Sequence, residues 1–154
     1  MEAIPYHSPV AIYHEQIAYL YQLAQVREKK VLQFLVGYLP RLQPRGEEVL
    51  EHLIFTQQDV EEAILNWYHF KSWSELSDFT NAVSEQETVV QFEQAVDAII
   101  AGDIVTLSLL LKKNPPLIHE RSLRWHRSTL LHYIGANGVE DFRQQSPPNS
   151  PAVL

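Results

Sequence analysis

The sequence predicts an all-α fold made of helical hairpins. Apolar residues recur at three- and four-residue spacing along most of the chain, as they do on the buried face of a helix. Helix start and stop signals separate these stretches, for example Ser8-Pro9 and Gly102-Asp103. No stretch has the alternating pattern of a convincing strand, and the β-branched pair Val89-Val90 falls inside a predicted helix.

The first helix is predicted to begin at Ser8-Pro9, because serine is a good N-cap and proline suits the first helical position. Apolar residues then follow a three–four alternation, which a break at 27–30 interrupts. One long helix or two stacked helices would satisfy this period. The apolar stripe either packs on its own domain or forms a dimer seam. It consists of Val10, Tyr13, Ile17, Leu20, Ala24, Val31, Phe34 and Tyr38.

Residues 40–46 are a predicted loop with two prolines, and 47–53 a predicted short helix. Thr56 is the predicted N-cap of the next helix, with acidic residues in its first turn. The tetrads Ser72-Trp73-Ser74-Glu75 and Ser84-Glu85-Gln86-Glu87 both have the sequence of a capping box. They are predicted to begin the two helices that follow.

Residues 92–138 indicate a helix, a turn, a second helix, a basic loop and a third helix. Gly102 suits the left-handed residue just past a helix end, and Asp103 is a strong N-cap for the next helix. Asn114-Pro115-Pro116 ends the second helix, because proline lacks an amide donor and restricts the residue before it. Two antiparallel helices, each with one apolar stripe, are expected around the turn.

This stretch resembles the ankyrin repeat, whose pattern starts Thr-Pro-Leu-His, passes a short helix and a glycine, and closes with a leucine-rich helix. Leu130 stands where proline is usual, and Ile134-Gly135 where two alanines are usual. Residues 92–114 are similar to the preceding repeat, without the Thr-Pro-Leu-His opening. The resemblance implies that the histidine of the opening bonds to loop backbone. Four residues match this repeat: Thr129, Leu131, His132 and Gly138.

The segment before the repeats is similar to the Gly-Phe-x-Ser-Trp-x-x-Leu element that precedes the repeats in many bacterial ankyrin proteins. His69 stands where glycine is usual. The ring of Trp73 is expected to be buried where this element joins the first repeat. The matching residues are Phe70, Ser72, Trp73 and Leu76.

Three parts are therefore expected: an N-terminal helical segment (1–46), a helical cap with the Ser-Trp element (47–84) and ankyrin-like repeats (85–154). Residues 147–154 repeat the helix-start pattern of Ser8-Pro9, so the last repeat is expected to be incomplete.

Composition limits the function classes. The chain has 154 residues, 45% of them hydrophobic, and a net charge of −7. Neither half is basic, which does not favour a nucleic-acid-binding surface over the whole molecule. The lack of cysteine excludes disulfides and thiolate zinc sites. No signal peptide or membrane span is visible, so a cytoplasmic protein is expected.

Catalytic and metal-binding patterns are not found. His119, His126 and His132 lie close in sequence, but no pair has the i, i+4 spacing of a helical zinc site. No nucleophile motif or phosphate-binding glycine-rich loop occurs, and adjacent acidic pairs point to different helix faces. We therefore expect no metal, no cofactor and no enzymatic activity.

The basic loop 119–128 is the best candidate for a partner-binding surface. Arginine and tryptophan are enriched at interface hot spots, and arginine can pair bidentately with a carboxylate. Alternatively, Trp125 covers the core beneath the loop, and the arginines pair with acidic helices nearby. The candidate residues are Arg121, Arg124, Trp125, His126 and Arg127.

The sequence favours a non-catalytic protein–protein interaction module of ankyrin-repeat type, with a protein partner. One alternative is a structural helical protein that forms a homo-oligomer and has no external ligand. Another is a small enzyme or ligand-binding bundle with a deep polar pocket.

Overall fold

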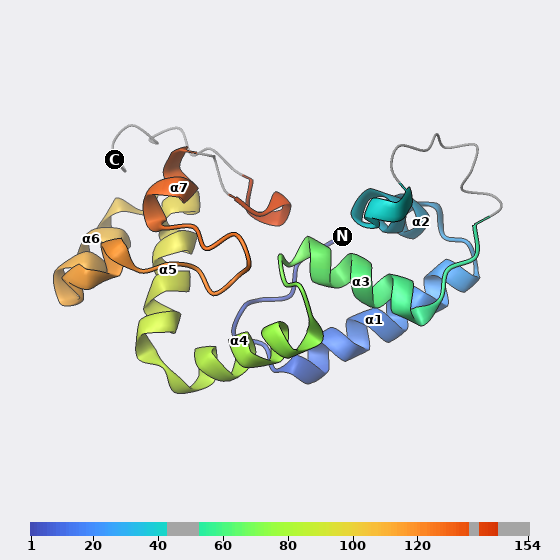
Figure 1. Cartoon of the computed structure of the whole chain (residues 1–154). Helices are drawn as coiled ribbons and strands as arrows, with labels where there is room; N and C mark the ends of the chain where they lie inside the picture. Colours follow the sequence, from blue (N-terminus) through green and yellow to red (C-terminus); the bar gives the residue numbers. More distant parts are fainter. Residues whose placement is uncertain (43–52, 136–138, 145–154) are drawn as a thin grey trace.

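The fold is all-helical in the computed structural model, which describes residues 1–42, 53–135 and 139–144 (Figure 1). No strand occurs in these residues, so the predicted fold class is confirmed. The α-helices are α1 (Val10–Gln25), α2 (Lys29–Tyr38), α3 (Gln57–Trp67), α4 (Trp73–Glu85), α5 (Glu87–Ala101), α6 (Ile104–Lys113) and α7 (Leu130–Gly135). The short 3₁₀ helices of the described residues are η1 (Pro40–Leu42), η3 (Pro115–His119) and η4 (Asp141–Arg143).

The predicted break in the first apolar stripe is confirmed. Helix α1 ends at Gln25, Arg27 adopts a left-handed conformation with φ 61°, and α2 begins at Lys29. The start of α1 differs from the prediction, because Pro9 occupies the N-cap position and no side chain caps the helix. Most of the stripe is buried against α3, so it packs within the chain.

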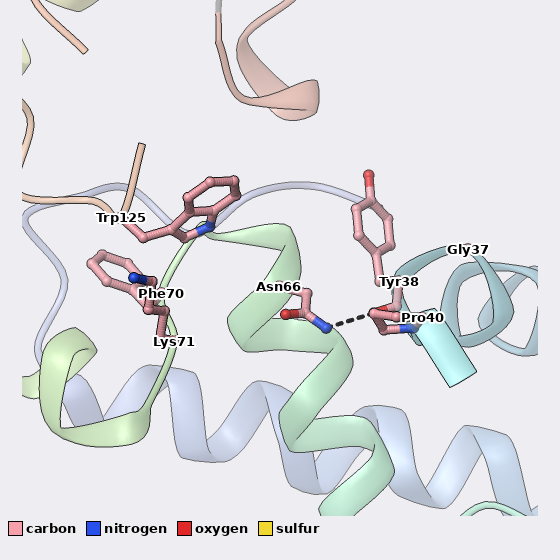
Figure 2. A pocket seen from close by; sticks show the side chains of 7 residues that line it. All are labelled: Gly37, Tyr38, Pro40, Asn66, Phe70, Lys71 and Trp125. Carbon is pink, nitrogen blue, oxygen red and sulfur yellow. Dashed lines mark hydrogen bonds between the residues drawn. The ribbon is translucent and has the colours of Figure 1, made fainter. Parts of the chain in front are cut away.

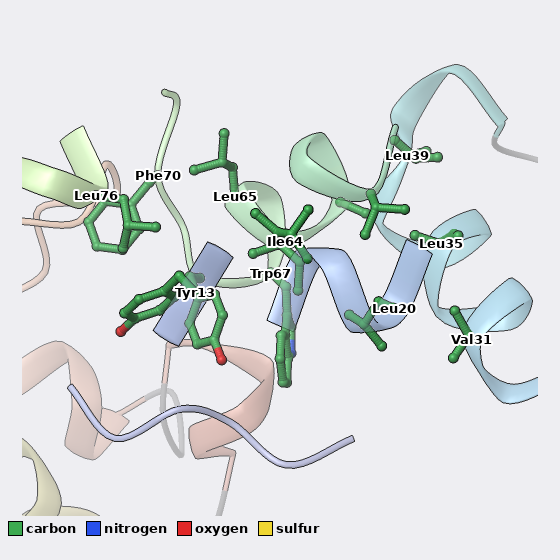
Figure 3. Packing of buried hydrophobic residues seen from close by; sticks show 14 of the residues in the cluster. Tyr13, Leu20, Val31, Leu35, Leu39, Ile64, Leu65, Trp67, Phe70 and Leu76 are labelled. Carbon is green, nitrogen blue, oxygen red and sulfur yellow. The ribbon is translucent and has the colours of Figure 1, made fainter. Parts of the chain in front are cut away.

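Helices α1 to α4 enclose one hydrophobic core, which we call the N-terminal core (Figure 3). The expected parts 1–46 and 47–84 both contribute to it, and therefore they form one packed unit. Trp73 is only partly buried at the margin of this core, where its ring lies tilted against His14 of α1 with the centroids 3.9 Å apart. It does not pack in the C-terminal core, as the expected join with the first repeat would require. Its buried residues are Tyr13, Ile17, Leu20, Ala24, Val31, Leu32, Leu35, Leu39, Leu42, Phe55, Val60, Ala63, Ile64, Leu65, Trp67, Tyr68, Phe70, Leu76, Phe79 and Val83.

The helix caps follow the predictions in part. Thr56 and Asp59 form a complete capping box at α3. Ser72 accepts from the amide of Glu75, but the Glu75 carboxylate accepts from Lys71 instead of completing the box. The prediction of a second capping box at 84–87 is wrong. Helix α4 continues through Ser84, and Gln86 alone separates α4 from α5. The Ser84 hydroxyl donates to the Asn81 carbonyl within α4, at 2.8 Å, and does not cap α5.

Some predictions fall outside the described residues. These are the short helix at 47–53, the repeat position Gly138 and the incomplete last repeat at 147–154. Leu53 is the one residue of the predicted short helix that the structure describes, and it is not helical.

The hairpin around Gly102 has the predicted form. Gly102 is left-handed (φ 69°) at the end of α5, and the Asp103 side chain accepts from the Thr106 amide at 3.0 Å to begin α6. Helix α6 ends at Lys113, before the two prolines. Helix α7 packs against α5, so the hairpin and the Thr129–His132 stretch are neighbours. The buried residues of this C-terminal core are Phe92, Ala95, Val96, Ala98, Ile99, Leu107, Leu117, Leu130 and Tyr133.

Gly102→Ala should lower the free energy of unfolding by about 1 kcal/mol, because a Cβ disfavours the left-handed conformation that ends α5. Urea denaturation of the purified variant measures this. Gly102→Asn should cost less, since asparagine tolerates this conformation. Equal losses for both substitutions would contradict the backbone explanation.

A short segment near the C-terminus joins the two cores. We call Val139–Gln144 the returning segment, because it leads from the C-terminal helices back to α2 and α3 (Figure 1). The Tyr38 hydroxyl donates to Asp141 at 2.5 Å. The ring of Phe142 packs edge-on against Trp67, with the centroids 5.7 Å apart. Nothing in the sequence pattern had indicated this role.

Phe142→Ala should destabilise the protein by about 2 kcal/mol, less than a fully buried phenylalanine would cost, since this ring is half-buried. Amide hydrogen exchange should also accelerate more in α5 and α7 than in α1, as the C-terminal helices lose their attachment. Gln144→Ala, an exposed change in the same segment, is the matched control. A uniform acceleration over both cores would contradict the attachment role.

Candidate interaction surface around Trp125

The loop 120–128 is fixed from beneath by Arg124. This side chain is only 3% exposed. Its Nε donates to Glu140 Oε1 at 2.9 Å, and its Nη2 lies 3.5 Å from Glu93 Oε2 on α5. The guanidinium also lies over the ring of Phe79, 4.6 Å from the centroid. Arg124 therefore connects the loop to both cores.

Glu140 is the centre of the polar contacts around Arg124. Besides Arg124, its Oε1 accepts from the Tyr133 hydroxyl at 2.8 Å and contacts His126 Nε2 at 3.3 Å. Burial raises the pKa of Glu140, but the bond to His126, the charges of Arg124 and Arg143 and the bond to Tyr133 outweigh this effect. The pKa lies well below the usual range, and the side chain is a carboxylate at neutral pH.

The ring of His126 is held in one tautomer. The Ser128 amide donates to Nδ1 at 3.1 Å, so Nδ1 is the acceptor and Nε2 carries the proton that faces Glu140. The neutral ring satisfies both contacts. His126 thus orients the loop and is not available to an outside ligand.

Arg143 is the second buried arginine, and it pairs with the acidic side chains of α5. Its Nη2 donates to Glu93 at 2.8 Å and to Asp97, one turn later on α5, at 3.3 Å. Two buried arginines thus face two buried glutamates, with the half-exposed Asp97 at the edge. We call Glu93, Arg124, Glu140 and Arg143 the buried ion cluster.

Above this cluster, Trp125 projects to the surface. The residue is 49% exposed, yet it is held at two points. The Trp125 amide donates to the His69 carbonyl at 3.0 Å, and the two rings stack with the centroids 5.4 Å apart and 19° between the planes. His69 adopts φ 61°, a conformation that suits the glycine usual at this position of the resembled element, so the tight turn forms despite the histidine.

A groove of about 520 Å³ lies beside Trp125 (Figure 2). It is bordered by the end of α2, by Asn66 of α3 and by the turn between α3 and α4. In Figure 2 Asn66 lies between Trp125 and Tyr38, and its amide donates to the Tyr38 carbonyl at 2.8 Å. The lining residues are Gly37, Tyr38, Pro40, Asn66, Phe70, Lys71 and Trp125.

The structure separates the five candidate residues of the loop into two groups. Arg124 and His126 are directed inward and hold the loop, so they are not exposed for a partner. For Arg124, this agrees with the alternative in which the arginines pair with acidic helices nearby. Arg121, Trp125 and Arg127 are exposed. The Arg121 side chain donates to the Arg127 carbonyl at 3.0 Å, and the described residues provide neither arginine with a carboxylate partner.

Sequence reasoning missed Glu93, Glu140 and Arg143. The sequence could have indicated an acidic pair at Glu93, because Glu93 and Asp97 stand four residues apart beside the apolar stripe of α5 and therefore lie on the same side of the helix. Glu140 and Arg143 lie in a short stretch without periodicity, and nothing local distinguishes them from solvated surface residues.

Neither a metal centre nor a membrane span is found among the described residues. They contain no group of three potential metal ligands and no helix long and apolar enough to cross a membrane. His132 Nδ1 accepts from the Thr129 amide at 3.2 Å and lies 2.8 Å from the Thr129 hydroxyl oxygen. The bond to the amide is of the kind that the resemblance implies for this histidine.

No protein-family model, curated protein or solved structure matches this chain.

Proposed function

We propose that this chain is a non-catalytic protein-interaction module of ankyrin-repeat type, and that it binds its partner through the Trp125 surface. By the Trp125 surface we mean the groove together with the exposed side chains of Lys71, Arg121, Trp125 and Arg127. The observation that carries the proposal is the fixed, half-exposed indole of Trp125. A large ring that is already immobilised loses little entropy on binding, which is typical of interface hot spots.

The ankyrin part of the proposal rests on geometry that agrees with the resemblance. It is supported by the α5–α6 hairpin with its left-handed glycine, by the packing of α7 on α5, and by the bond between Thr129 and His132. Repeat folds of this kind commonly serve as binding scaffolds, although a fold alone does not specify a partner. The cytoplasmic location stays a prediction.

The homo-oligomer alternative has less support. It rested on the apolar stripe of α1 and α2 and on the incomplete last repeat. Helix α3 of the same chain covers most of the stripe, and the end of the last repeat lies outside the described residues. A seam would need an exposed apolar face.

Site-specific photo-crosslinking tests the proposed function. A benzophenone amino acid replaces Trp125 in one variant and Tyr19, an exposed residue of α1, in the control variant. Extracts of the cells that naturally produce the protein are irradiated with each. Discrete adducts at position 125 that are weaker or missing at position 19 are expected. Equal labelling at both positions, or none at 125, would overturn the proposal.

A further inference from the structure

The N-terminal core and the C-terminal core meet at a contact that we call the joint. On the C-terminal side lies the buried ion cluster, whose four residues all belong to the chain from Glu93 onward. On the N-terminal side lie aromatic rings: the guanidinium of Arg124 is 5.2 Å from the ring centroid of Phe70 and 4.6 Å from that of Phe79. The ion pairs of the cluster therefore do not cross the joint.

Besides Arg124, the loop 120–128 and the returning segment close the joint. In the loop, the Trp125 amide donates to the His69 carbonyl and the two rings stack. In the returning segment, Asp141 accepts from the Tyr38 hydroxyl, and the half-buried ring of Phe142 packs on the N-terminal core. The closing contacts are thus hydrogen bonds and partly exposed rings, which are typical of an interface that can open.

The chain passes from one core to the other at a sharp corner between two helices. Gln86 alone separates α4 from α5, and its backbone is extended with φ −120° and ψ 107°. Figure 1 shows α4 and α5 meeting at an angle at this point. Helices α6 and η3 pack on α5, as α7 does, so the C-terminal helices form one body. A residue at a helix end can absorb the backbone rotation that swings such a body, which makes Gln86 suited to be a hinge.

The charges of the cluster favour an opening of the joint. Desolvating charged side chains is costly, and the attraction within a buried pair often does no more than offset that cost. Both members of every pair in the cluster lie on the C-terminal body and would move together. Opening the joint therefore gives four charged side chains access to water and breaks none of the ion pairs between them.

We infer that the two cores separate at the joint as folded bodies, with Gln86 as the hinge and the buried ion cluster carried intact on the C-terminal body. Opening breaks the contact of Trp125 with His69, so the Trp125 surface is complete only when the joint is closed. A partner that binds this surface would hold the joint shut, because a ligand shifts an equilibrium toward the state that it prefers. This consequence for binding rests on the proposed function, whereas the opening itself does not.

Distances between pairs of spin labels test the opening by double electron–electron resonance. Since the chain contains no cysteine, Glu15→Cys with Lys112→Cys places one label on α1 and one on α6, both at exposed positions. Adding Phe142→Ala removes a closing contact and should add a second peak to the distance distribution of this pair. Adding Gln144→Ala instead should not. Labels at Glu15→Cys and Lys30→Cys, both on the N-terminal body, should keep one distance in every background.

Two further measurements separate opening from unfolding. Far-ultraviolet circular dichroism of Phe142→Ala should keep the wild-type helical signal, since both bodies stay folded. Exchange of the Trp125 amide hydrogen, which bonds across the joint, should rise roughly thirtyfold in Phe142→Ala. The Arg127 amide bonds within the loop to the Arg124 carbonyl and should not follow it. Tyr38→Phe removes only the hydroxyl bond to Asp141 and should cause the same changes to a smaller extent.

A single, unchanged distance in Phe142→Ala would overturn the inference. A second distance that appears together with a loss of helical signal would also overturn it, because the C-terminal helices would then unfold instead of moving as a body. If Phe142→Ala does not fold, Tyr38→Phe decides between the same two outcomes. These measurements use no partner, so the crosslinking test of Trp125 can succeed or fail independently of them.

Discussion

Arg124→Ala should lower the free energy of unfolding by about 3–5 kcal/mol, the range for breaking a buried ion pair by removing one partner. Its guanidinium faces Glu93 and Glu140, which are 1% and 0% exposed and would lose a counter-charge where water cannot replace it. The substitution also removes packing on Phe70 and Phe79. Urea denaturation followed by circular dichroism measures the loss.

Arg121→Ala is the matched control for this result. Arg121 stands in the same loop but is exposed, and within the described part of the chain its side chain bonds only to a backbone carbonyl. Its removal should change stability by less than about 0.5 kcal/mol. Similar losses for the two variants would contradict a buried role for Arg124. In a double-mutant cycle, Arg124→Ala and Glu140→Gln should be strongly non-additive, because the two groups contact each other.

Glu140→Gln should cost about 3 kcal/mol at pH 7, since it leaves Arg124 and Arg143 with too little negative charge. This loss should also depend on pH. The folded pKa of Glu140 lies below its ordinary value of 4.5, so the carboxylate contributes its full stability above that value. As the pH falls below about 4.5, the unfolded chain takes up a proton that the folded protein does not, and the contribution is lost.

The measurement is urea denaturation of both proteins at several pH values between 7 and 2.5. The difference in unfolding free energy between the wild type and the glutamine variant should be constant above pH 5 and shrink below it. The raised pKa of Asp97, caused first by burial, acts in the opposite direction, but it is present in both proteins and largely cancels. A difference that stayed constant down to pH 2.5 would show that Glu140 does not titrate as inferred.

Local signals in the sequence predicted the helices and several of their ends. The left-handed Gly102, the Asp103 cap and the proline stop after α6 depend only on residues within a few positions of one another. The Thr56 capping box is equally local. The failed box at 84–87 marks the limit, because a serine hydroxyl can cap the next helix or bond back to a carbonyl of its own helix, and Ser84 does the second.

The sequence predicted the proposed Trp125 surface only in outline. The composition of loop 119–128 indicated a contact region, but nothing in the sequence showed which of the neighbours Arg124 and Trp125 would be exposed. One is buried and the other is half-exposed, because Glu93 and Glu140 accept the arginine below the loop and His69 supports the indole above it. Those partners lie 31, 16 and 56 residues away in sequence, by subtraction of residue numbers.

The sequence by itself determined an all-helical chain, the turn at 102–103 and the absence of any thiol chemistry, because propensity, capping and composition act over short distances. Only the tertiary structure decided which charges are buried and how the returning segment joins the two cores. It also decided where a groove opens beside Trp125. These features arise from desolvation and packing between distant segments, and they depend on the spatial arrangement of residues that no local pattern relates.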